Sequence, residues 1–385
     1  MIKNSAKVLV VDMMSGANDY GVELCCSLSK FVDLTVVTVD NSPLEATPEL
    51  KVIKCFPAFG GRAGKLQKAA GLLSAYAKLI SELWRHRNGI VHIQFFRFPF
   101  LDLLVYLAAG FIVKNMVYTA HNALPHERRY WSAAIYRLWY RGVDGIHVLS
   151  ENAKSEICRV AGGRTRNKIF VIPHGNYERL FVRTGGAEKI GRTRDGGSLV
   201  GLQFGLVRPY KGVDLLVRSA AHLPQGCDVT FRIVGGGDPG LIEEYRQLAG
   251  ELGVSSRFTF KNTFLSDDEL ALEICDADFL VFPYRNIYQS GALMLAMTFG
   301  KPIIANDIPG LKEYAFPDCA LFVDAEDGEQ FSRMIEALEG DRRLRHALGA
   351  AAFSRAWTRY NWSNIAAAME RMYLQVAKRD FGEVA

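Results

Sequence analysis

Short runs of apolar residues alternate with helical patterns along most of the chain. An apolar run of about four to eight residues between turn signals is typical of a buried strand, and apolar residues three and four apart predict a helix. In the first half the predicted strands are Lys7–Val11, Leu34–Val39, Gly89–Ile93, Met116–Thr119, Gly145–Leu149 and Ile169–Ile172. The helical patterns between them are Gly21–Lys30, Leu66–Arg87, Asp102–Val113, Ala133–Tyr140 and Glu151–Arg159. Apolar strands separated by helices predict a parallel sheet covered on both faces.

The pattern stops and then restarts. Residues 177–197 are rich in Gly, Arg and Thr and have no periodicity, which indicates a linker between domains. The strands predicted after it are Leu199–Phe204, Thr230–Val234, Phe258–Lys261, Phe279–Val281, Ile303–Ala305 and Leu321–Val323, with helical patterns between them and from Glu329 onward. A chain of 385 residues is also too long for one ordinary core. We therefore expect an α/β protein with two Rossmann-like doubly wound domains, 1–176 and 198–355, that face a cleft, followed by a terminal helical segment, 356–385.

Composition narrows the class of protein. A hydrophobic content of 49% and a charged content of 23% are those of a soluble globular protein. The seven cysteines are scattered and none forms a C-x-x-C pair, so we expect reduced thiols in the cytoplasm, without a disulfide framework or a metal site. The first residues lead directly into a strand, with no cleavable apolar region.

Charge is distributed unevenly. Residues 1–180 contain 23 Lys and Arg against 14 Asp and Glu, a net charge of +9, whereas the remainder has a net charge of −4. A basic half attracts anionic partners such as a membrane surface, a lipid phosphate or a nucleic acid. There is no basic run with interleaved aromatic residues, so nucleic acid is not expected. We expect a peripheral association of the first domain with an anionic membrane, at the inner face of the plasma membrane.

The longest apolar run, residues 98–113, contains Asp102. It is shorter than the stretch of about 20 residues that spans a bilayer. We therefore favour a buried core helix here over a surface that dips into lipid.

The strongest chemical signal is the loop from Phe204 to Gly212. It follows an apolar strand, breaks at Gly205, carries Arg208 and Lys211, and opens a helical pattern. Backbone N–H groups and cations at such a point are suited to hold a diphosphate. The same residues are also compatible with a basic loop that is only exposed to water.

Other strand ends carry candidate residues. His121 lies at the end of the strand that precedes it, where it is either a ligand or catalytic group or a histidine satisfied by backbone. His174, between Pro173 and Gly175, is either a ligand group or part of a hinge turn. Gly16 and Gly237 lie in glycine loops after strands, where a ligand can approach the backbone.

A second strong feature starts at Tyr284. Ser290 can cap a helix that begins at Gly291, and the free N–H groups of that helix would face an anion. Residues 307–313 supply the carboxylates near the next strand. Asp276 and Asp278 have the spacing of a metal-binding D-x-D motif, but they lie where a helix ends and a strand begins, so we interpret them as structural.

Taken together, several of these segments resemble the GT-B fold glycosyltransferases, family 4-like (group 1). The segments are Arg208–Gly212, Pro173–Tyr177, the His121–Asn122 strand end, Gln289–Gly291 and Gly300–Ala305. The paired glutamates of that family would fall at Ile287 and Leu295, and the Gln-Ser-Gly variant stands there instead. The arginine usual after the loop glycine is Leu206 here, and Arg208 is the substitute.

The resemblance implies transfer of one sugar from a UDP- or GDP-linked donor to an acceptor hydroxyl, with retention and without a metal ion or cofactor. A saccharide or lipid-linked saccharide of surface polysaccharide synthesis would be the acceptor. Lys211 and Arg208 would stabilise the leaving diphosphate, and His121 would lie near the transferred sugar. The residues expected to bind the donor are Gly16, His174, Gly205, Gly237, Tyr284, Gln289, Ser290, Gly291 and Glu313. The segment that starts near Tyr360 would return to the first domain.

Two other functions remain open. The absence of the glutamate pair is compatible with a non-catalytic GT-B scaffold subunit that binds a nucleotide sugar or a polymer. A nucleotide-sugar epimerase of the same fold would act without an acceptor.

Overall fold

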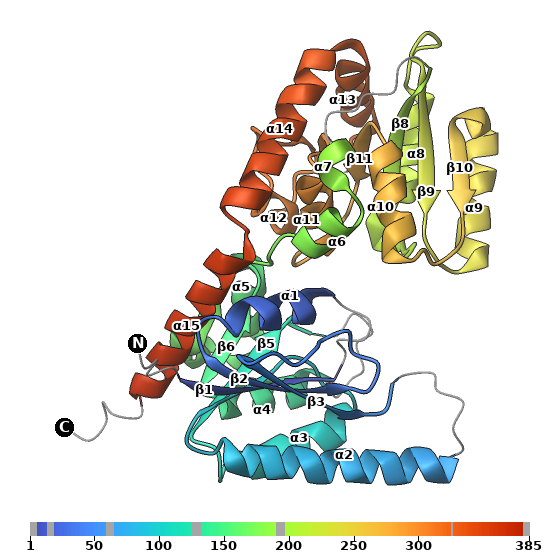
Figure 1. Ribbon diagram of the computed structural model, residues 1–385. Coiled ribbons are helices and arrows are strands. Elements are labelled where there is room, and N and C mark those ends of the chain that lie inside the picture. The colour runs from blue at the N-terminus through green and yellow to red at the C-terminus, as the bar shows by residue number, and fades with distance from the viewer. Residues whose placement is uncertain are drawn as a thin grey trace. The chain divides into compact units, whose positions relative to one another are not determined.

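The computed structural model describes residues 6–13, 19–58, 65–124, 132–189, 197–324 and 326–379. The chain forms two compact units (Figure 1). The N-terminal unit contains residues 1–175 together with residues 362–385, and the C-terminal unit contains residues 176–361. Both are α/β units built on a parallel sheet, as the alternation of strands and helices predicts.

The N-terminal unit has a seven-stranded parallel sheet in the order β3-β2-β1-β4-β5-β6-β7. Its strands are β1 (Lys7–Asp12), β2 (Asp33–Val39), β3 (Leu50–Phe56), β4 (Ile90–Ile93), β5 (Asn115–Ala120), β6 (Gly145–Val148) and β7 (Ile169–Val171). Its helices are α1 (Asp19–Leu28), α2 (Lys65–Arg85), α3 (Pro99–Ala109), α4 (Ser132–Gly142), α5 (Glu151–Ala161), the 3-10 turn Gly163–Lys168, and α15 (Trp362–Arg379).

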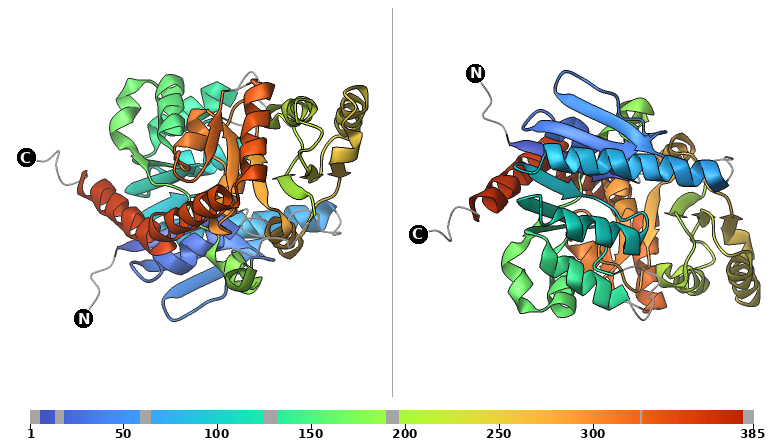
Figure 2. Two further views of the ribbon diagram at one scale, coloured as in Figure 1. Left: turned by 90° about the horizontal axis from the view of Figure 1, so that it is seen from above. Right: turned by 90° about the horizontal axis from the view of Figure 1, so that it is seen from below.

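The two faces of this sheet carry different helices. Helices α1 and α15 pack together on one face, with Val8, Val10 and Trp362 in their shared core. Helices α2 and α3 lie on the opposite face (Figure 1). The last helix of the chain therefore completes the core of the first unit, and its path beside α1 can be followed in Figure 2.

The C-terminal unit has a six-stranded parallel sheet in the order β10-β9-β8-β11-β12-β13. Its strands are β8 (Leu199–Phe204), β9 (Val229–Val234), β10 (Phe258–Lys261), β11 (Phe279–Phe282), β12 (Ile303–Asn306) and β13 (Leu321–Val323). Its α-helices are α6 (Glu178–Arg183), α7 (Gly186–Lys189), α8 (Val213–Ala221), α9 (Pro239–Glu251), α10 (Asp267–Asp276), α11 (Gly291–Thr298), α12 (Pro309–Lys312), α13 (Gly328–Gly340) and α14 (Arg342–Thr358). Short 3-10 turns span Pro209–Lys211 and Ser255–Arg257.

Two cores hold this unit together, one on each face of its sheet. Residues of α10, α11 and α14 form one core with β8 and β11. Residues of α8, α9 and α13 form the other. Both are built from aliphatic and aromatic side chains, as the apolar strand runs require.

Two expectations need correction. Strand β3 was not predicted: it is an edge strand that pairs with β2 alone among the described strands, and only its end residues Leu50 and Phe56 are buried, so it forms no continuous apolar run. The stretch 177–197 is not a featureless linker, because residues 178–189 form α6 and α7. Leu180 and Phe181 of α6 are buried in the core of the C-terminal unit, and the short apolar run at residues 180–182 in a polar segment gives no periodic pattern.

The apolar run at residues 98–113 also differs from the expectation. It forms α3 and the turn after it, and Leu103, Tyr106 and Ala109 are buried. The other side of the same segment is exposed and apolar: Phe100 is 56% exposed and Phe111 is 94% exposed. It is therefore not a core helix but a helix with apolar residues on both its buried and its exposed face.

Candidate active site

In both sheets the strand order reverses beside the first strand of the unit. Strand β1 lies between β2 and β4, and β8 lies between β9 and β11. Ligands of doubly wound sheets bind outside the carboxyl ends of the strands at such a switch point. Gln94, directly after β4, donates its backbone N–H to the carbonyl of Val11 in β1 at 3.0 Å. In the second unit Gly205 follows β8 and Tyr284 follows β11 by two residues.

The loop after β8 depends on its glycines. Gly205 has φ 91° and Gly212 has φ 66°, both in the left-handed region that favours glycine. A Cβ on Gly212 would lie 1.9 Å from the carbonyl oxygen of Pro283, and one on Gly205 would lie 2.8 Å from Lys211 Nζ. The tight turn therefore brings the Lys211 amine to the end of β8.

Lys211 is a buried cation at this point. It is 8% exposed, and its Nζ donates to the carbonyl of Phe204 at 3.1 Å and lies 5.4 Å from the centre of the Tyr284 ring. Burial lowers its pKa to about 8. It forms no ion pair with a carboxylate of the described residues. Its charge is therefore available to an anionic ligand. Arg208, three residues earlier, is exposed at the start of the turn.

An ion-pair network fixes the loop from the other side. Arg285 forms a bidentate pair with Asp214 of α8, with contacts of 2.8 and 2.7 Å, and a second pair with Glu326 at 2.5 Å. Its backbone N–H donates to the carbonyl of Tyr210, and its Nη1 donates to the carbonyl of Pro209. The Arg285 guanidinium holds the pKa of Asp214 below its usual value. This arginine was not predicted as a site residue. Its position directly after Tyr284, at the end of a predicted strand, could have indicated it.

The N-terminus of α11 lies in the segment that follows. Ser290 is 3% exposed and caps the helix, since its Oγ accepts from the N–H of Leu293 at 3.1 Å. Gln289 Nε2 is buried and has no hydrogen-bond acceptor among the described residues. A Cβ on Gly291 would lie 2.7 Å from the Tyr177 hydroxyl. The unpaired Gln289 amide and the N–H groups of the first turn of α11 therefore lie at this helix end, which suits an anion or a hydroxyl-rich ligand.

The glycine loop after β9 packs against the loop after β8. A Cβ on Gly235 would lie 2.2 Å from the carbonyl oxygen of Gly205, and one on Gly237 would lie 2.8 Å from Val207 Cβ. Close backbone packing therefore explains both glycines. A cavity of about 90 Å³ adjoins the two loops and is lined by apolar groups that include Leu206 and Phe264.

In the N-terminal unit a cluster of rings gathers His121 and His174. The Tyr20 ring lies 5.0 Å from the His121 ring and 4.9 Å from the His174 ring, measured between centroids. His121 stacks on Phe95 at 4.1 Å, and its Nε2 lies 3.2 Å from the side-chain amide of Gln94. The two predicted histidines therefore do lie together, through residues the sequence analysis did not single out. Gln94 and Phe95 directly follow β4. Their position at the carboxyl end of a predicted strand could have identified them as candidates.

The charge state of these histidines follows from burial. Burial lowers the pKa of His121, and the neighbouring histidines add to the effect. Burial also lowers the pKa of His174 to about 4, and its Nδ1–H donates to the carbonyl of Gly175 at 2.5 Å. Both rings are neutral at pH 7. Gly175 faces the Trp362 indole, where a Cβ would lie 2.4 Å from the ring.

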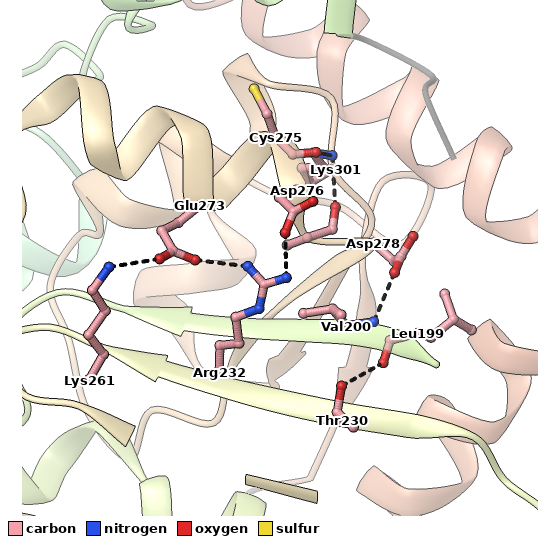
Figure 3. A network of polar contacts seen from close by, with 11 residues as sticks. Leu199, Val200, Thr230, Arg232, Lys261, Glu273, Cys275, Asp276, Asp278 and Lys301 are labelled. Carbon is pink, nitrogen blue, oxygen red and sulfur yellow. Dashed lines mark hydrogen bonds and ion pairs between the residues drawn. The ribbon is translucent and has the colours of Figure 1, made fainter. Parts of the chain in front are cut away.

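The D-x-D pair has structural partners (Figure 3). Asp276 pairs with Arg232, which also bonds Glu273 at 2.9 Å. Asp278 accepts the backbone N–H of Val200 at 2.8 Å. The two carboxylates therefore hold α10 and β11 onto the sheet. Glu313 is half-buried at the end of α12, and Gly16 lies outside the described residues.

The arrangement of strands resembles that of solved structures. Sucrose-phosphate synthase from Thermosynechococcus elongatus superposes with a TM-score of 0.71 at 19% identity, covering 96% of this chain and 99% of that one. Anabaena HepE in complex with UDP superposes with a TM-score of 0.66 at 18% identity, covering 96% of this chain and all of that one. The two doubly wound units thus have the GT-B fold.

Family models assign both halves of the chain. Residues 14–176 match the model described as Glycosyltransferase Family 4, and residues 200–341 match the model described as Glycosyl transferases group 1. The chain therefore consists of a glycosyltransferase family 4 domain followed by a glycosyl transferases group 1 domain.

Three curated proteins are similar to this chain in sequence, each over only part of its length. A D-inositol 3-phosphate glycosyltransferase from Xylanimonas cellulosilytica is 32% identical over 273 residues, which are 70% of this chain and 60% of that protein. An MMP alpha-(1->4)-mannosyltransferase from Mycolicibacterium hassiacum is 27% identical, over 69% of this chain and 66% of that protein. A GDP-mannose:glycolipid 4-beta-D-mannosyltransferase from Xanthomonas campestris pv. campestris is 26% identical, over 49% of each chain. The matches thus span from about half to two thirds of these relatives.

Proposed function

We propose that this protein transfers one sugar from a nucleotide-diphosphate-sugar to an acceptor hydroxyl. The observation that carries the proposal is the convergence of Gly205, Lys211, Gln289 and the Ser290-capped helix at the switch point of the second sheet. A buried ammonium beside a glycine loop and a helix N-terminus is suited to a diphosphate. The solved structures of similar fold include one that binds UDP, and one relative is named for GDP-mannose, which supports a UDP- or GDP-linked donor.

In this proposal the protein's own groups supply the positive charge. Negative charge grows on the leaving diphosphate as the bond to the sugar breaks, and stabilising that charge is the largest catalytic contribution expected. Lys211 and the N–H groups of α11 would contact the diphosphate, and the exposed Arg208 would add a second cation. We propose that the reaction proceeds on these groups without a metal ion and with retention at the anomeric carbon. The cavity beside Leu206 and Phe264 would take the nucleobase.

We place the acceptor on the N-terminal unit. His121 is neutral and lies among aromatic rings at the carboxyl edge of the first sheet. A neutral imidazole can exchange hydrogen bonds with sugar hydroxyls without attracting an anion. A saccharide, linked to a lipid of surface polysaccharide synthesis, would therefore bind near His121.

The exposed side of α3 supports the lipid linkage. Phe100, Leu104 and Phe111 are 56%, 66% and 94% exposed and lie within one short segment. The one acidic residue of α3, Asp102, is buried and accepts hydrogen bonds from Tyr76 and from the backbone N–H of Phe98. The segment thus presents apolar surface without negative charge, as a surface that enters lipid does.

Neighbouring charges favour an anionic bilayer over a protein partner. Lys114 follows the segment and is exposed, and the adjacent helix α2 exposes Lys78 and Arg85 beside Trp84. Tryptophan and basic residues around an apolar surface match the headgroup region of an anionic membrane. No helix of the described residues is long and apolar enough to cross a bilayer. We therefore propose peripheral binding through α3.

The activity is tested by incubating the protein with UDP- and GDP-sugars and a lipid-linked saccharide acceptor, with and without a chelator. We expect nucleotide release coupled to acceptor glycosylation, unchanged by the chelator, and an axial anomeric linkage in the product by NMR for an α-linked donor. Donor binding without turnover would contradict the proposal and indicate a scaffold. Interconversion of the donor sugar without acceptor would indicate an epimerase.

Membrane binding is tested with vesicles of phosphatidylglycerol and phosphatidylcholine. We expect sedimentation with anionic vesicles, and a loss of about thirtyfold in affinity for Phe111→Ser, since burying one aromatic side chain in lipid contributes about 2 kcal/mol. Leu272→Ser, which changes an apolar residue 54% exposed in the C-terminal unit, is the matched control and leaves binding unchanged. Equal losses in both variants, or no sedimentation of the wild type, would contradict the proposal.

A further inference from the structure

A row of buried polar side chains lies beneath His121. His92 of β4, Thr119 of β5 and His147 of β6 occupy adjacent parallel strands, and Tyr373 of α15 covers them. All four are fully buried. The links are Tyr373 Oη to His92 Nδ1 at 2.7 Å, His92 Nε2 to Thr119 Oγ1 at 2.6 Å, and Thr119 Oγ1 to His147 Nδ1 at 2.9 Å. Four buried polar groups in a core are costly unless each one is satisfied.

The end of this row fixes the position of every hydrogen. His147 Nε2 lies 2.9 Å from the carbonyl oxygen of Ile172, which can only accept, so this nitrogen carries a hydrogen. Burial keeps His147 neutral at pH 7, so its Nδ1 has none and accepts the Thr119 hydroxyl. The Thr119 oxygen must then accept from His92 Nε2–H. His92 is neutral as well, so its Nδ1 accepts from the Tyr373 hydroxyl. The reverse order would require a second hydrogen on His147 and hence a buried cation.

Gln94 connects this row to His121. Its side-chain amide lies between the two rings, 3.3 Å from His92 Nε2 and 3.2 Å from His121 Nε2. The two ends of such an amide are distinguished by their partners. The one hydrogen on His92 Nε2 is already donated to Thr119 Oγ1, and an amide NH2 beside it would set two donors against each other. An amide oxygen in that place shares the same hydrogen, so we assign the oxygen of Gln94 to the side of His92 and its NH2 to the side of His121. His121 Nε2 then accepts, and the hydrogen of His121 lies on Nδ1.

We propose that His92, Thr119 and His147 of this buried row, anchored on the Ile172 carbonyl, act through Gln94 to hold His121 in the tautomer with its hydrogen on Nδ1. These are positioning residues, since none of them is placed to touch a substrate. The role of His121 toward a sugar rests on the function proposed above, but its tautomer does not. The row thereby determines which His121 nitrogen can donate and which can accept.

The tautomer can be observed directly by NMR. In protein labelled with ¹⁵N-histidine, each imidazole nitrogen gives a pyrrole-like or a pyridine-like shift, and single substitutions assign the eight histidines. We expect a pyridine-like Nε2 and a pyrrole-like Nδ1 for His121. Gln94→Glu keeps the shape of the side chain but can only accept, so we expect His121 Nε2 to become protonated. A protonated Nε2 in the wild type, or an unchanged pattern in Gln94→Glu, would overturn the proposal.

Variants of the row separate positioning from packing. Thr119→Val removes the hydroxyl that orients His92, so we expect a mixture of His121 tautomers, whereas Thr119→Ser retains the wild-type pattern. Tyr373→Phe removes only the far donor and leaves His92 Nε2–H in place, so we expect no change at His121. An unchanged tautomer in folded Thr119→Val would contradict the proposal, and Gln94→Glu decides the question if that variant does not fold. The NMR measurement needs no nucleotide-sugar. It therefore tests the tautomer of His121 even if the protein shows no glycosyltransferase activity.

Discussion

The two units use the same sheet topology and place polar groups at the same switch point, but their chemistry is opposite. The N-terminal unit carries neutral histidines that are linked to each other through Thr119 and bonded to backbone. In the C-terminal unit the equivalent edge carries a buried lysine, an exposed arginine, glycine loops and a helix N-terminus. The comparison teaches that the scaffold fixes where a ligand binds, while side-chain charge determines which ligand. A neutral polar edge suits a hydroxyl acceptor, and a cationic edge suits a diphosphate.

The sharpest test of this difference replaces Lys211. We expect Lys211→Met to lower kcat by 10²- to 10³-fold, because loss of one preorganised donor to a developing charge costs about 3–4 kcal/mol. Lys301 is a matched control: it is equally buried in the same unit, but its Nζ donates to the carbonyls of Cys275 and Ala277. Lys301→Met should destabilise the fold and leave kcat of the folded protein unchanged. Equal kcat losses would show that burial, and not position, explains the effect.

A second test concerns the packing of the N-terminal unit. Gly175→Ala would place a methyl group against the Trp362 indole, so we expect a loss of about 1–3 kcal/mol in the free energy of unfolding. Gly163→Ala meets no atom within 4 Å and serves as control. Urea unfolding measures both. Equal stabilities would mean that Trp362 can move aside and does not anchor α15.

A third test loosens the donor loop without touching its cation. Arg285→Met removes the bidentate pair with Asp214, and exposed or half-exposed ion pairs of this kind contribute about 1 kcal/mol. We expect a several-fold rise in the donor KM with a smaller change in kcat, since the loop over residues 209–211 loses its support. Steady-state kinetics with varied donor measure this. A fall in kcat with unchanged KM would instead place Arg285 on the reacting groups.

The smallest effect expected is a difference in pH dependence between the units. Burial lowers the pKa of Lys211 to about 8, so above that pH the native state loses a proton that the unfolded chain keeps up to about 10.5. The stability contributed by this group therefore rises between those values. Donor affinity needs the ammonium and should fall severalfold above pH 8. Lys211→Met should show neither trend.

The histidines of the N-terminal unit should respond only to acid. His174 has a pKa of about 4 in the folded protein against 6.5 for the free side chain. Its contribution to stability is therefore complete above pH 6.5 and is lost as the pH falls from 6.5 toward 4. Hydrogen exchange of peptides from β6 and α15 across this range measures the effect. Equal acid sensitivity of peptides from β8 and α8 of the C-terminal unit would contradict the expected difference between the two units.

Much of the fold and part of the candidate site could be predicted from the sequence. The apolar runs of β8 and β11 could be identified because both their faces are buried, and Lys211 could be found because glycines flank a cation after a strand. Gln94 and Arg285 could not be assigned, because their importance lies in partners distant in the sequence. Gln94 acts between His92 and His121, and Arg285 between Asp214 and Glu326.

The sequence by itself determined the alternation of strands and helices, the glycine turns and the charge of each half, since these depend on neighbours along the chain. Only the tertiary structure decided which side of residues 98–113 is exposed, which rings surround His121, and how the buried histidines share their hydrogens. Those properties depend on contacts between β4, β5, β6 and α15, and no local pattern specifies how such segments meet. The packing of these segments determines which side chains are buried and which group donates in each hydrogen bond.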